Sequence, residues 1–207
     1  LRSAPRRPGG FSGSDATAPL LGLASQAVFD HDGIDAAGAE VSMYAYRVDA
    51  GRVLARALDD AHVVDPSSIV LGLPRGGVPV AAQVARSLGR PLDVLVVRKI
   101  GAPFDPEFAL GAVGEDGIVV ADANSAERAG IDAGTLARLA DDQRQEVDRR
   151  SAALRSRFPR LPLAGATAVI VDDGLATGAT AAAAVGVARA QGAARLIVAA
   201  PVASDAA

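Results

Sequence analysis

The sequence predicts an α/β fold in which a doubly wound, mainly parallel β-sheet is flanked by helices. Three observations predict it. Four short apolar segments have the length of buried strands: residues 68–73, 92–97, 167–171 and 195–200. Segments with a helical spacing of apolar residues alternate with them, which is typical of βαβ units. Half of the 207 residues are hydrophobic and 22 % are charged, so the chain can bury one sizeable core.

Helices are expected before and between these strands, at residues 48–61, 77–88 and 178–191. Asp49 is a possible N-cap of the first helix, and Gly89 ends the second. Residues 97–107 hold two prolines and a glycine, which predict a loop rather than a helix.

A small hairpin and a helical insertion interrupt the alternation. Residues 108–113 and 117–120 flank the turn Glu115-Asp116-Gly117, which predicts two antiparallel strands that extend the edge of the sheet. Residues 132–158 form a long, charge-rich helical stretch with a thin apolar stripe. A solvated helix with salt-bridging faces is the simpler interpretation, and a dimer contact is the alternative.

Two regions are expected along the chain. Residues 1–42 are rich in Gly, Ser, Asp and Ala and predict a disordered tail, whereas residues 43–207 predict a single domain. The chain stops shortly after the last expected strand, which a doubly wound sheet usually covers with another helix. We therefore expect the domain to be truncated at its C-terminus.

Composition excludes several classes of function. The absence of cysteine excludes disulfides, thiolate zinc sites and cysteine nucleophiles. A formal net charge of −3 gives no support for a nucleic-acid backbone binder. No apolar run approaches the ~20 residues that a membrane helix needs. We expect a cytoplasmic protein with neither a nucleic-acid nor a membrane partner.

The most informative segment is the turn after the third strand, Asp172-Asp173-Gly174-Leu175-Ala176-Thr177-Gly178-Ala179-Thr180. Its two carboxylates can accept hydrogen bonds from a vicinal diol or hold hydrated Mg²⁺. The amides at the start of the next helix suit a phosphate, and Gly178 permits close approach of the backbone. The alternative is an ordinary strand–helix turn with Asp and Thr as caps. The combination of paired acids, glycine and two threonines favours a sugar phosphate.

Two further segments follow strands of the same sheet. Pro74-Arg75-Gly76-Gly77 offers successive amides and a guanidinium to an anion, although a plain glycine-rich turn is an equal interpretation on its own. Arg98 and Lys99 place two cations after the second strand, and Glu107 in the same expected loop can orient a ligand or a metal-bound water. Lys99 is the single lysine among 21 basic residues, which indicates either chance or a position that needs a flexible ammonium.

The segment that begins at Asp172 resembles the signature with which type I phosphoribosyltransferases bind phosphoribosyl pyrophosphate (PRPP). The segments that contain Arg75 and Lys99 occur in order with it, as in an uncharacterised bacterial branch of that family. The resemblance extends from Met43 to Ala203, about four-fifths of the chain. One departure is Gly174, where the family more often has an aliphatic residue.

The resemblance implies a role for each matched residue. Asp172 and Asp173 correspond to residues that hold the ribose hydroxyls, and they are expected to hold Mg²⁺ through water. The 5′-phosphate site corresponds to Ala176, Thr177, Gly178, Ala179 and Thr180. The pyrophosphate site corresponds to Arg75, Gly76 and Gly77. Arg98 and Lys99 correspond to a mobile basic loop that closes over the pyrophosphate, and with the two aspartates they are the expected catalytic residues.

The implied function is transfer of the phosphoribosyl group from PRPP to a nitrogenous base, with Mg²⁺ as cofactor and release of pyrophosphate. Catalysis of this kind rests on positioning and electrostatic stabilisation. A purine is a mild preference from the Arg-Lys segment, and a homodimer is expected. One alternative is a non-catalytic PRPP-binding regulatory protein, and another is an interaction domain that binds no PRPP.

Overall fold

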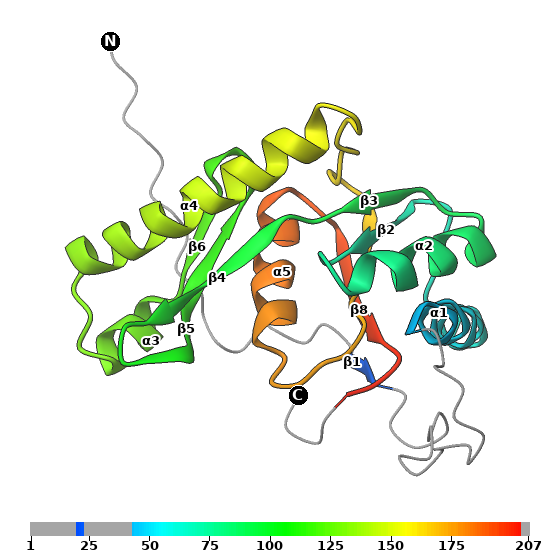
Figure 1. The fold of residues 1–207 in the computed structure, drawn as a ribbon, viewed down its shortest axis with the longest axis horizontal. Coiled ribbons are helices and arrows are strands. Elements are labelled where there is room, and N and C mark those ends of the chain that lie inside the picture. Colours follow the sequence, from blue (N-terminus) through cyan, green and yellow to red (C-terminus); the bar gives the residue numbers. More distant parts are fainter. Residues whose placement is uncertain (1–19, 23–42, 204–207) are drawn as a thin grey trace.

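A computed structural model describes residues 20–22 and 43–203 of the chain, with side chains from Arg47 onward. Two sheets and one helix between them organise this part of the chain (Figure 1). One sheet has five strands and the other has three, and α5 (Ala179–Ala190) packs against both. The predicted fold class is therefore confirmed, with a second sheet added to it.

The five-stranded sheet is parallel throughout, in the order β1-β8-β7-β2-β3. Its strands are β1 (Leu20–Gly22), β2 (Ser68–Gly72), β3 (Leu92–Val94), β7 (Thr167–Val171) and β8 (Arg195–Ala200). The bounds of β7 and β8 are those that the sequence predicts. Strands that are apolar on both faces are expected where helices cover both sides of a parallel sheet.

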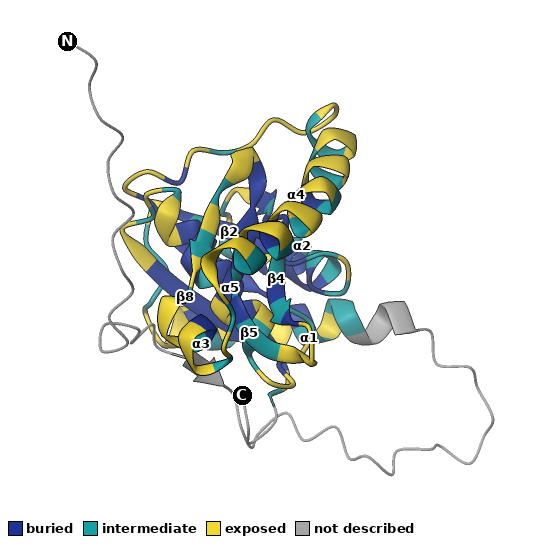
Figure 2. Cartoon of the chain, turned by 90° about the vertical axis from the view of Figure 1, so that its left-hand side faces the viewer, coloured by how far each residue is buried: buried dark blue, intermediate teal, exposed yellow. Residues whose placement is uncertain are grey.

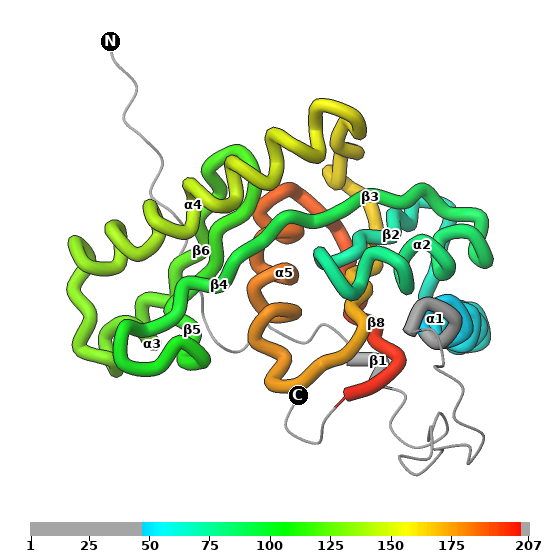
Figure 3. The backbone as a smooth tube through the Cα atoms, viewed as in Figure 1, coloured from blue at the N-terminus to red at the C-terminus, as the bar shows by residue number. Residues whose placement is uncertain are grey.

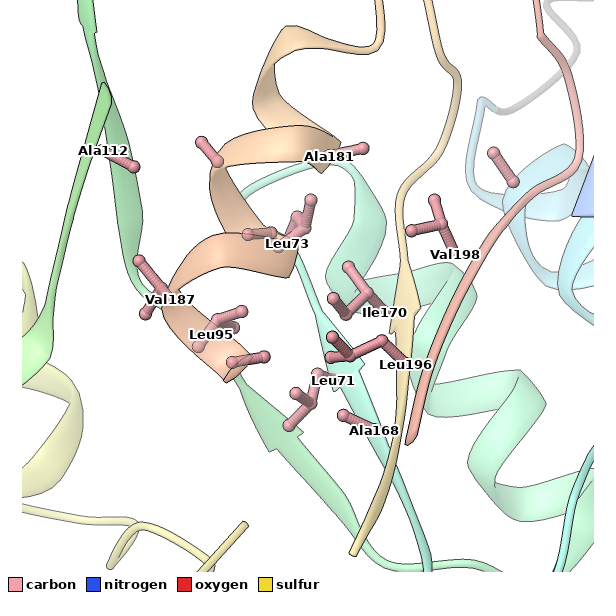
Figure 4. Packing of buried hydrophobic residues seen from close by; sticks show 14 of the residues in the cluster. Leu71, Leu73, Leu95, Ala112, Ala168, Ile170, Ala181, Val187, Leu196 and Val198 are labelled. Carbon is pink, nitrogen blue, oxygen red and sulfur yellow. The ribbon is translucent and has the colours of Figure 1, made fainter. Parts of the chain in front are cut away.

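Helices cover both faces of this sheet. One face packs against α1 (Met43–Asp60) and α2 (Gly77–Leu88), and the other packs against α5. Alternate residues of β7 show this. Val169 and Val171 belong to a first cluster of buried residues, on the side of α1 and α2, and Ala168 and Ile170 belong to a second cluster, on the side of α5. Figure 4 shows the second cluster around Ile170. Burial of each valine or isoleucine side chain stabilises the fold by about 1.5–3 kcal/mol.

The first two helices confirm one expected cap and correct the other. Gly89 ends α2 in the left-handed region (φ 61°), and its amide bonds to the carbonyl oxygens of Ala85 and Arg86. Asp49, by contrast, is not an N-cap, because α1 begins at Met43. It lies inside the helix and forms a 2.8 Å ion pair with Arg52. No proline or glycine separates Met43 from Asp49, so nothing in the sequence stops the helix from starting earlier.

The three-stranded sheet is antiparallel, in the order β4-β5-β6. Its elements are β4 (Val97–Ala102), β5 (Asp105–Gly114), the 3₁₀ turn η1 (Glu115–Gly117) and β6 (Val119–Ala121). The predicted hairpin around η1 is confirmed. Its strands do not extend the parallel sheet, however, because α5 lies between the two sheets. Figure 3 shows the chain passing from β3 into β4 along one extended path.

The predicted strand at residues 92–97 and the predicted loop at residues 97–107 are therefore wrong in part. The strand of the parallel sheet ends at Val94, and the supposed loop is a hairpin of β4 and β5. Gly101 makes this possible, since a Cβ atom there would lie 2.5 Å from the carbonyl oxygen of Pro106. The register of β4 and β5 shifts on both sides of Gly101, and this irregularity accommodates Pro106 in β5 as a β-bulge does.

Two helices pack on the antiparallel sheet. The sequence did not predict α3 (Ala123–Arg128), which Asp122 caps by accepting from the Ser125 amide at 3.1 Å. The predicted long helix is α4 (Ala133–Arg155), capped by Asp132. It covers the face of the antiparallel sheet that is turned away from α5. Figure 2 shows that its outer side is exposed, as expected for a charge-rich helix.

The last turn of α4 differs from the rest of that helix, because Arg155 is inserted between two buried carboxylates. Its Nη1 atom lies 2.6 Å from Oδ1 of Asp93, and its Nε atom lies 2.7 Å from Oε2 of Glu115. The guanidinium also donates to the carbonyl oxygen of Val94 at 2.8 Å. This ion cluster ties α4, β3 and η1 together where the chain crosses between the two sheets, so the interpretation of a solvated face does not hold for Arg155.

The predicted tail is only partly covered by the structure. Residues 20–22 lie within it and form β1, which pairs with β8. The other residues of 1–42 and residues 204–207 lie outside the described part of the chain, so the tail and the truncated C-terminus stay predictions. Within the described ranges, no helix combines the length and hydropathy that a membrane span requires.

Candidate functional site

The carboxyl ends of β2 and β7 lie side by side because these strands are parallel neighbours. Gly72 pairs with Val171, and the Leu73 amide donates to the Val171 carbonyl oxygen at 2.9 Å. The turn at residues 74–77 and the Asp172-Asp173 pair therefore leave the sheet at the same edge. Open α/β sheets bind their ligands at this edge.

Two glycines bring the turn after β2 into contact with the carboxylates. A Cβ atom on Gly76 would collide with the carboxylate of Asp173. A Cβ atom on Gly77 would lie 2.5 Å from the carbonyl oxygen of Val171. A side chain at either position would displace the carboxylate or the strand end, so both glycines are needed for this approach. Arg75, whose peptide bond to Pro74 is cis, is exposed beside them.

The two carboxylates differ in their surroundings. Asp173 accepts from Nη2 of Arg47, on α1, at 3.0 Å. Burial raises the pKa of Asp172 to about 6, and the neighbouring charge of Asp173 acts in the same direction. A hydrogen bond from the Asp173 amide to Oδ1 of Asp172, at 2.9 Å, opposes this shift. Asp172 therefore holds a proton far more readily than an ordinary aspartate.

Residues 176–180 connect this pair to α5. Leu175 is buried, and its amide donates to the Val202 carbonyl oxygen at 2.9 Å, which anchors the start of the loop. Gly178 is the N-cap of α5 and adopts φ 69°, a left-handed conformation that favours glycine. Thr177 and Thr180 are exposed on either side of it. The loop thus presents a helix N-terminus and two hydroxyl groups, a combination that suits a phosphate.

Arg98 and Lys99 lie on β4 and point to opposite faces of the antiparallel sheet. Nε of Arg98 donates to Oε1 of Gln143, on α4, at 2.9 Å. Lys99 pairs across the strands with Ala112, which packs against α5, so Lys99 lies on the α5 side. Its Nζ atom is 2.7 Å from Oε2 of Glu107. The structure therefore separates two side chains that the sequence predicts to act together, and it places neither on a loop.

Comparison with known proteins gives this geometry a family. The family model described as "Phosphoribosyl transferase domain" matches residues 47–207. The chain belongs to the phosphoribosyltransferase family. Within this match lie the carboxylate pair, the glycine turn and the loop at the start of α5.

Named relatives agree with this assignment to the phosphoribosyltransferases. Two Mycobacterium tuberculosis proteins are each 52 % identical over 159 residues, covering 77 % of this chain and 35 % of their own length. They are "Putative phosphoribosyl transferase MT0597" (strain CDC 1551 / Oshkosh) and "Putative phosphoribosyl transferase Rv0571c" (strain ATCC 25618 / H37Rv). This chain thus spans about a third of their length. The crystal structure of TT1426 from Thermus thermophilus is 47 % identical, covers 77 % of this chain and 75 % of that chain, and gives a TM-score of 0.72.

A cavity of about 130 Å³ lies between α5 and the antiparallel sheet. Its walls are mostly alanine and glycine. Ala112, the cross-strand partner of Lys99, and Ala179, the first residue of α5, both line it. Lys99 therefore lies on the side of the antiparallel sheet that faces α5 and this cavity.

Arg47 is a residue of this site that the sequence did not reveal. It lies 126 positions before Asp173, on a helix whose apolar spacing indicates only that it packs on the sheet. An arginine near the start of an amphipathic helix carries no signal of its own. Only the placement of α1 beside the carboxyl edge of β7 reveals the contact.

The carboxylate pair is also the set of donors that a metal ion would meet at this site. Among the described residues, no group of three or more His, Cys, Asp or Glu side chains gathers in one place. A closed protein cage for a metal is therefore not what these residues form. Mg²⁺ is commonly held by one or two carboxylates together with water and substrate phosphates, and Asp172 and Asp173 fit that mode.

Proposed function

We propose that this chain transfers the phosphoribosyl group of PRPP to a nitrogenous base. In this reaction the bond between the anomeric carbon and a pyrophosphate oxygen breaks, and a bond from that carbon to a ring nitrogen forms. Pyrophosphate leaves with the electron pair of the broken bond, and the acceptor nitrogen loses its proton to water.

The contact between Gly76 and Asp173 carries this proposal. PRPP has a pyrophosphate and ribose hydroxyls on adjacent carbons, so its two binding groups must be close together. The glycine turn and the carboxylate pair touch, and the N-terminus of α5 follows the pair by a few residues. An anion, a diol and a second phosphate can therefore be held in one row along the sheet edge.

Each group has a task that its chemistry allows. The carboxylates of Asp172 and Asp173 accept hydrogen bonds from the ribose hydroxyls. The amides of residues 176–180 and the hydroxyls of Thr177 and Thr180 donate to the 5′-phosphate. Gly76 and Gly77 present amides to the pyrophosphate, and Arg75 adds a fork of donors. These groups orient the anomeric carbon for attack, which is the main contribution to catalysis in this proposal.

Lys99 takes the part of the cation that meets the charge growing on pyrophosphate. Its flexible ammonium is a point charge that can follow a moving anion. The side chain of Arg98 is held by Gln143 on α4, and in this proposal it also keeps β4 in place for Lys99. Asp172 and Asp173 would hold Mg²⁺ through water, and the ion would supply positive charge next to the leaving pyrophosphate.

The test is pyrophosphate release from PRPP and Mg²⁺ over a panel of purine and pyrimidine bases. Turnover with at least one base is expected. In the double variant Asp172→Asn, Asp173→Asn it is expected to be lost, whereas Asp141→Asn, Asp142→Asn should leave it unchanged. The control pair is also two adjacent aspartates, on exposed positions of α4. PRPP binding without turnover on any base would favour the regulatory alternative.

A cytoplasmic location and a homodimer belong to the same proposal. Size-exclusion chromatography with light scattering tests the dimer directly. A monomer at micromolar concentration that still releases pyrophosphate would show that the dimer is not needed.

A further inference from the structure

Arg47 meets the site at one particular atom. Its Nη2 donates to Oδ2 of Asp173 at 3.0 Å. The same Oδ2 is the atom nearest to where a Cβ on Gly76 would stand. The guanidinium of Arg47, the carboxylate of Asp173 and the glycine turn therefore converge on a single oxygen.

The backbone that carries Arg47 is held firmly. Gly51, one turn later on α1, packs so closely on α2 that a Cβ atom there would lie 2.7 Å from the Cβ of Gln83. Leu54 and Leu58 are buried on the same helix. The helix axis is therefore fixed, and only the long side chain of Arg47, about a third of it exposed, is free to change partner.

The chemistry of the three groups favours a change of partner. A guanidinium has only donors and a carboxylate has only acceptors, so a ribose hydroxyl or a metal-bound water can compete with Arg47 for the lone pair of Oδ2 that Nη2 now uses. A ligand that donates to Oδ2 from the position that Nη2 of Arg47 now occupies displaces the guanidinium. The adjacent acceptor is then the anion on the Gly76 turn, and arginine binds phosphate oxygens through paired donors.

We propose that Arg47 is a further pyrophosphate-binding residue, supplied by α1. It neutralises Asp173 while the site is free and moves to a pyrophosphate oxygen when PRPP binds. This inference rests on the proposed function, since it assigns a new residue to the same site. Arg47 and Arg75 then approach the pyrophosphate from two different elements.

Calorimetry with two partial ligands tests this assignment. Inorganic pyrophosphate and ribose 5-phosphate, each with Mg²⁺, are titrated into the wild type, Arg47→Gln and Arg47→Lys. Arg52→Gln is the matched control, because Arg52 lies on the same helix in an exposed ion pair with Asp49. Urea unfolding of each variant shows whether the fold is retained, and titration of the wild type with PRPP shows whether the proposed function holds.

Arg47→Gln is expected to weaken pyrophosphate binding at least tenfold, about 1.4 kcal/mol, with ribose 5-phosphate within twofold of wild type or tighter. Arg47→Lys should recover part of the loss, and Arg52→Gln should lose nothing. Unchanged pyrophosphate affinity in Arg47→Gln would overturn the inference alone. An equal loss for both ligands would also overturn it, because Arg47 would then only position Asp173. A wild type that binds neither PRPP nor pyrophosphate would overturn the proposed function first.

Discussion

Two pairs of carboxylates in this chain lie in opposite situations. Asp93 and Glu115 are almost fully buried, and Arg155 satisfies both with short, charge-assisted hydrogen bonds. Asp172 and Asp173 lie half-buried at an open sheet edge, where Arg47 donates to a single oxygen of Asp173. The first pair is closed to solvent, whereas the second has acceptor atoms that face it.

This difference separates a structural pair from a ligand-binding pair. Burial alone would lower the pKa of Arg155, but its bonds to Glu115 and Asp93 outweigh this and raise it above the usual range. Arg155 is therefore held in its charged state between the two carboxylates. At the open edge, burial instead raises the pKa of Asp172, so its charge is only partly compensated. Incomplete compensation of this kind is a common mark of functional sites.

The largest expected effect comes from removing Arg155 from between Asp93 and Glu115. Arg155→Met leaves Asp93 and Glu115 buried without a partner, and we expect the free energy of unfolding to fall by about 3–5 kcal/mol. Urea denaturation followed by circular dichroism measures it. Arg149→Met, on an exposed side of the same helix, should unfold at the wild-type urea concentration. If the two variants unfold at the same urea concentration, the ion cluster of Arg155, Asp93 and Glu115 does not stabilise the junction between the sheets.

The next effect concerns the contact between Gly76 and Asp173. Gly76→Ala adds a methyl group where the carboxylate lies, while its φ of −64° suits alanine. We expect PRPP affinity to fall at least tenfold, or about 1.4 kcal/mol, with the fold retained. Gly174→Ala is the matched control, since the nearest atom to its Cβ would be 3.8 Å away. Equal affinities of the two variants in calorimetry would show that the contact does not shape the site.

A smaller effect is expected from Lys99→Arg. The side chain keeps its charge but loses the compact ammonium that Glu107 holds at 2.7 Å. Turnover is expected to fall about tenfold, equivalent to about 1.4 kcal/mol of transition-state stabilisation, with PRPP binding mostly kept. Steady-state kinetics gives kcat, and calorimetry gives the affinity. Unchanged turnover would make the single lysine an accident of composition.

A further expected effect, on stability rather than on ligand binding, is a pH dependence. The pKa of Asp172 is about 6 in the folded chain and lies near its ordinary value in the unfolded chain. Between these two values the folded state binds more protons, so this group makes stability fall as pH rises from about 4 to 6. Asp172→Asn should remove that part of the fall. Urea midpoints across this range measure it, and identical slopes would contradict the raised pKa.

Regular elements were predictable where one local signal acted alone. Strands β7 and β8 and helix α2 have the predicted bounds, because continuous apolar runs and a C-terminal glycine are strong local signals. The segment from Leu92 to Pro106 was not predictable in this way. An apolar run there crosses from one sheet to the other, and prolines that usually exclude strands sit beside a glycine bulge.

The residues of the candidate site likewise divide into those that the sequence predicts and those that it does not. The segments that contain Asp172 and Gly76 each follow a predicted strand, so the parallel topology is enough to place them close together. Arg47 and the partners of Lys99 depend on how α1 and the antiparallel sheet pack, which no local pattern encodes. The sequence did not reveal the role of Arg155 for the same reason, since most of the other charged residues of α4 are exposed.

The central claim is that the open carboxylate pair binds PRPP. The most direct measurement is a calorimetric titration of PRPP with Mg²⁺ into the wild type, the double variant Asp172→Asn, Asp173→Asn and the control Asp141→Asn, Asp142→Asn. We expect saturable binding to the wild type and the control, and a loss of at least a hundredfold, or about 2.7 kcal/mol, in the first double variant. Wild-type affinity in that variant, or no binding to the wild type at millimolar PRPP, would contradict the account.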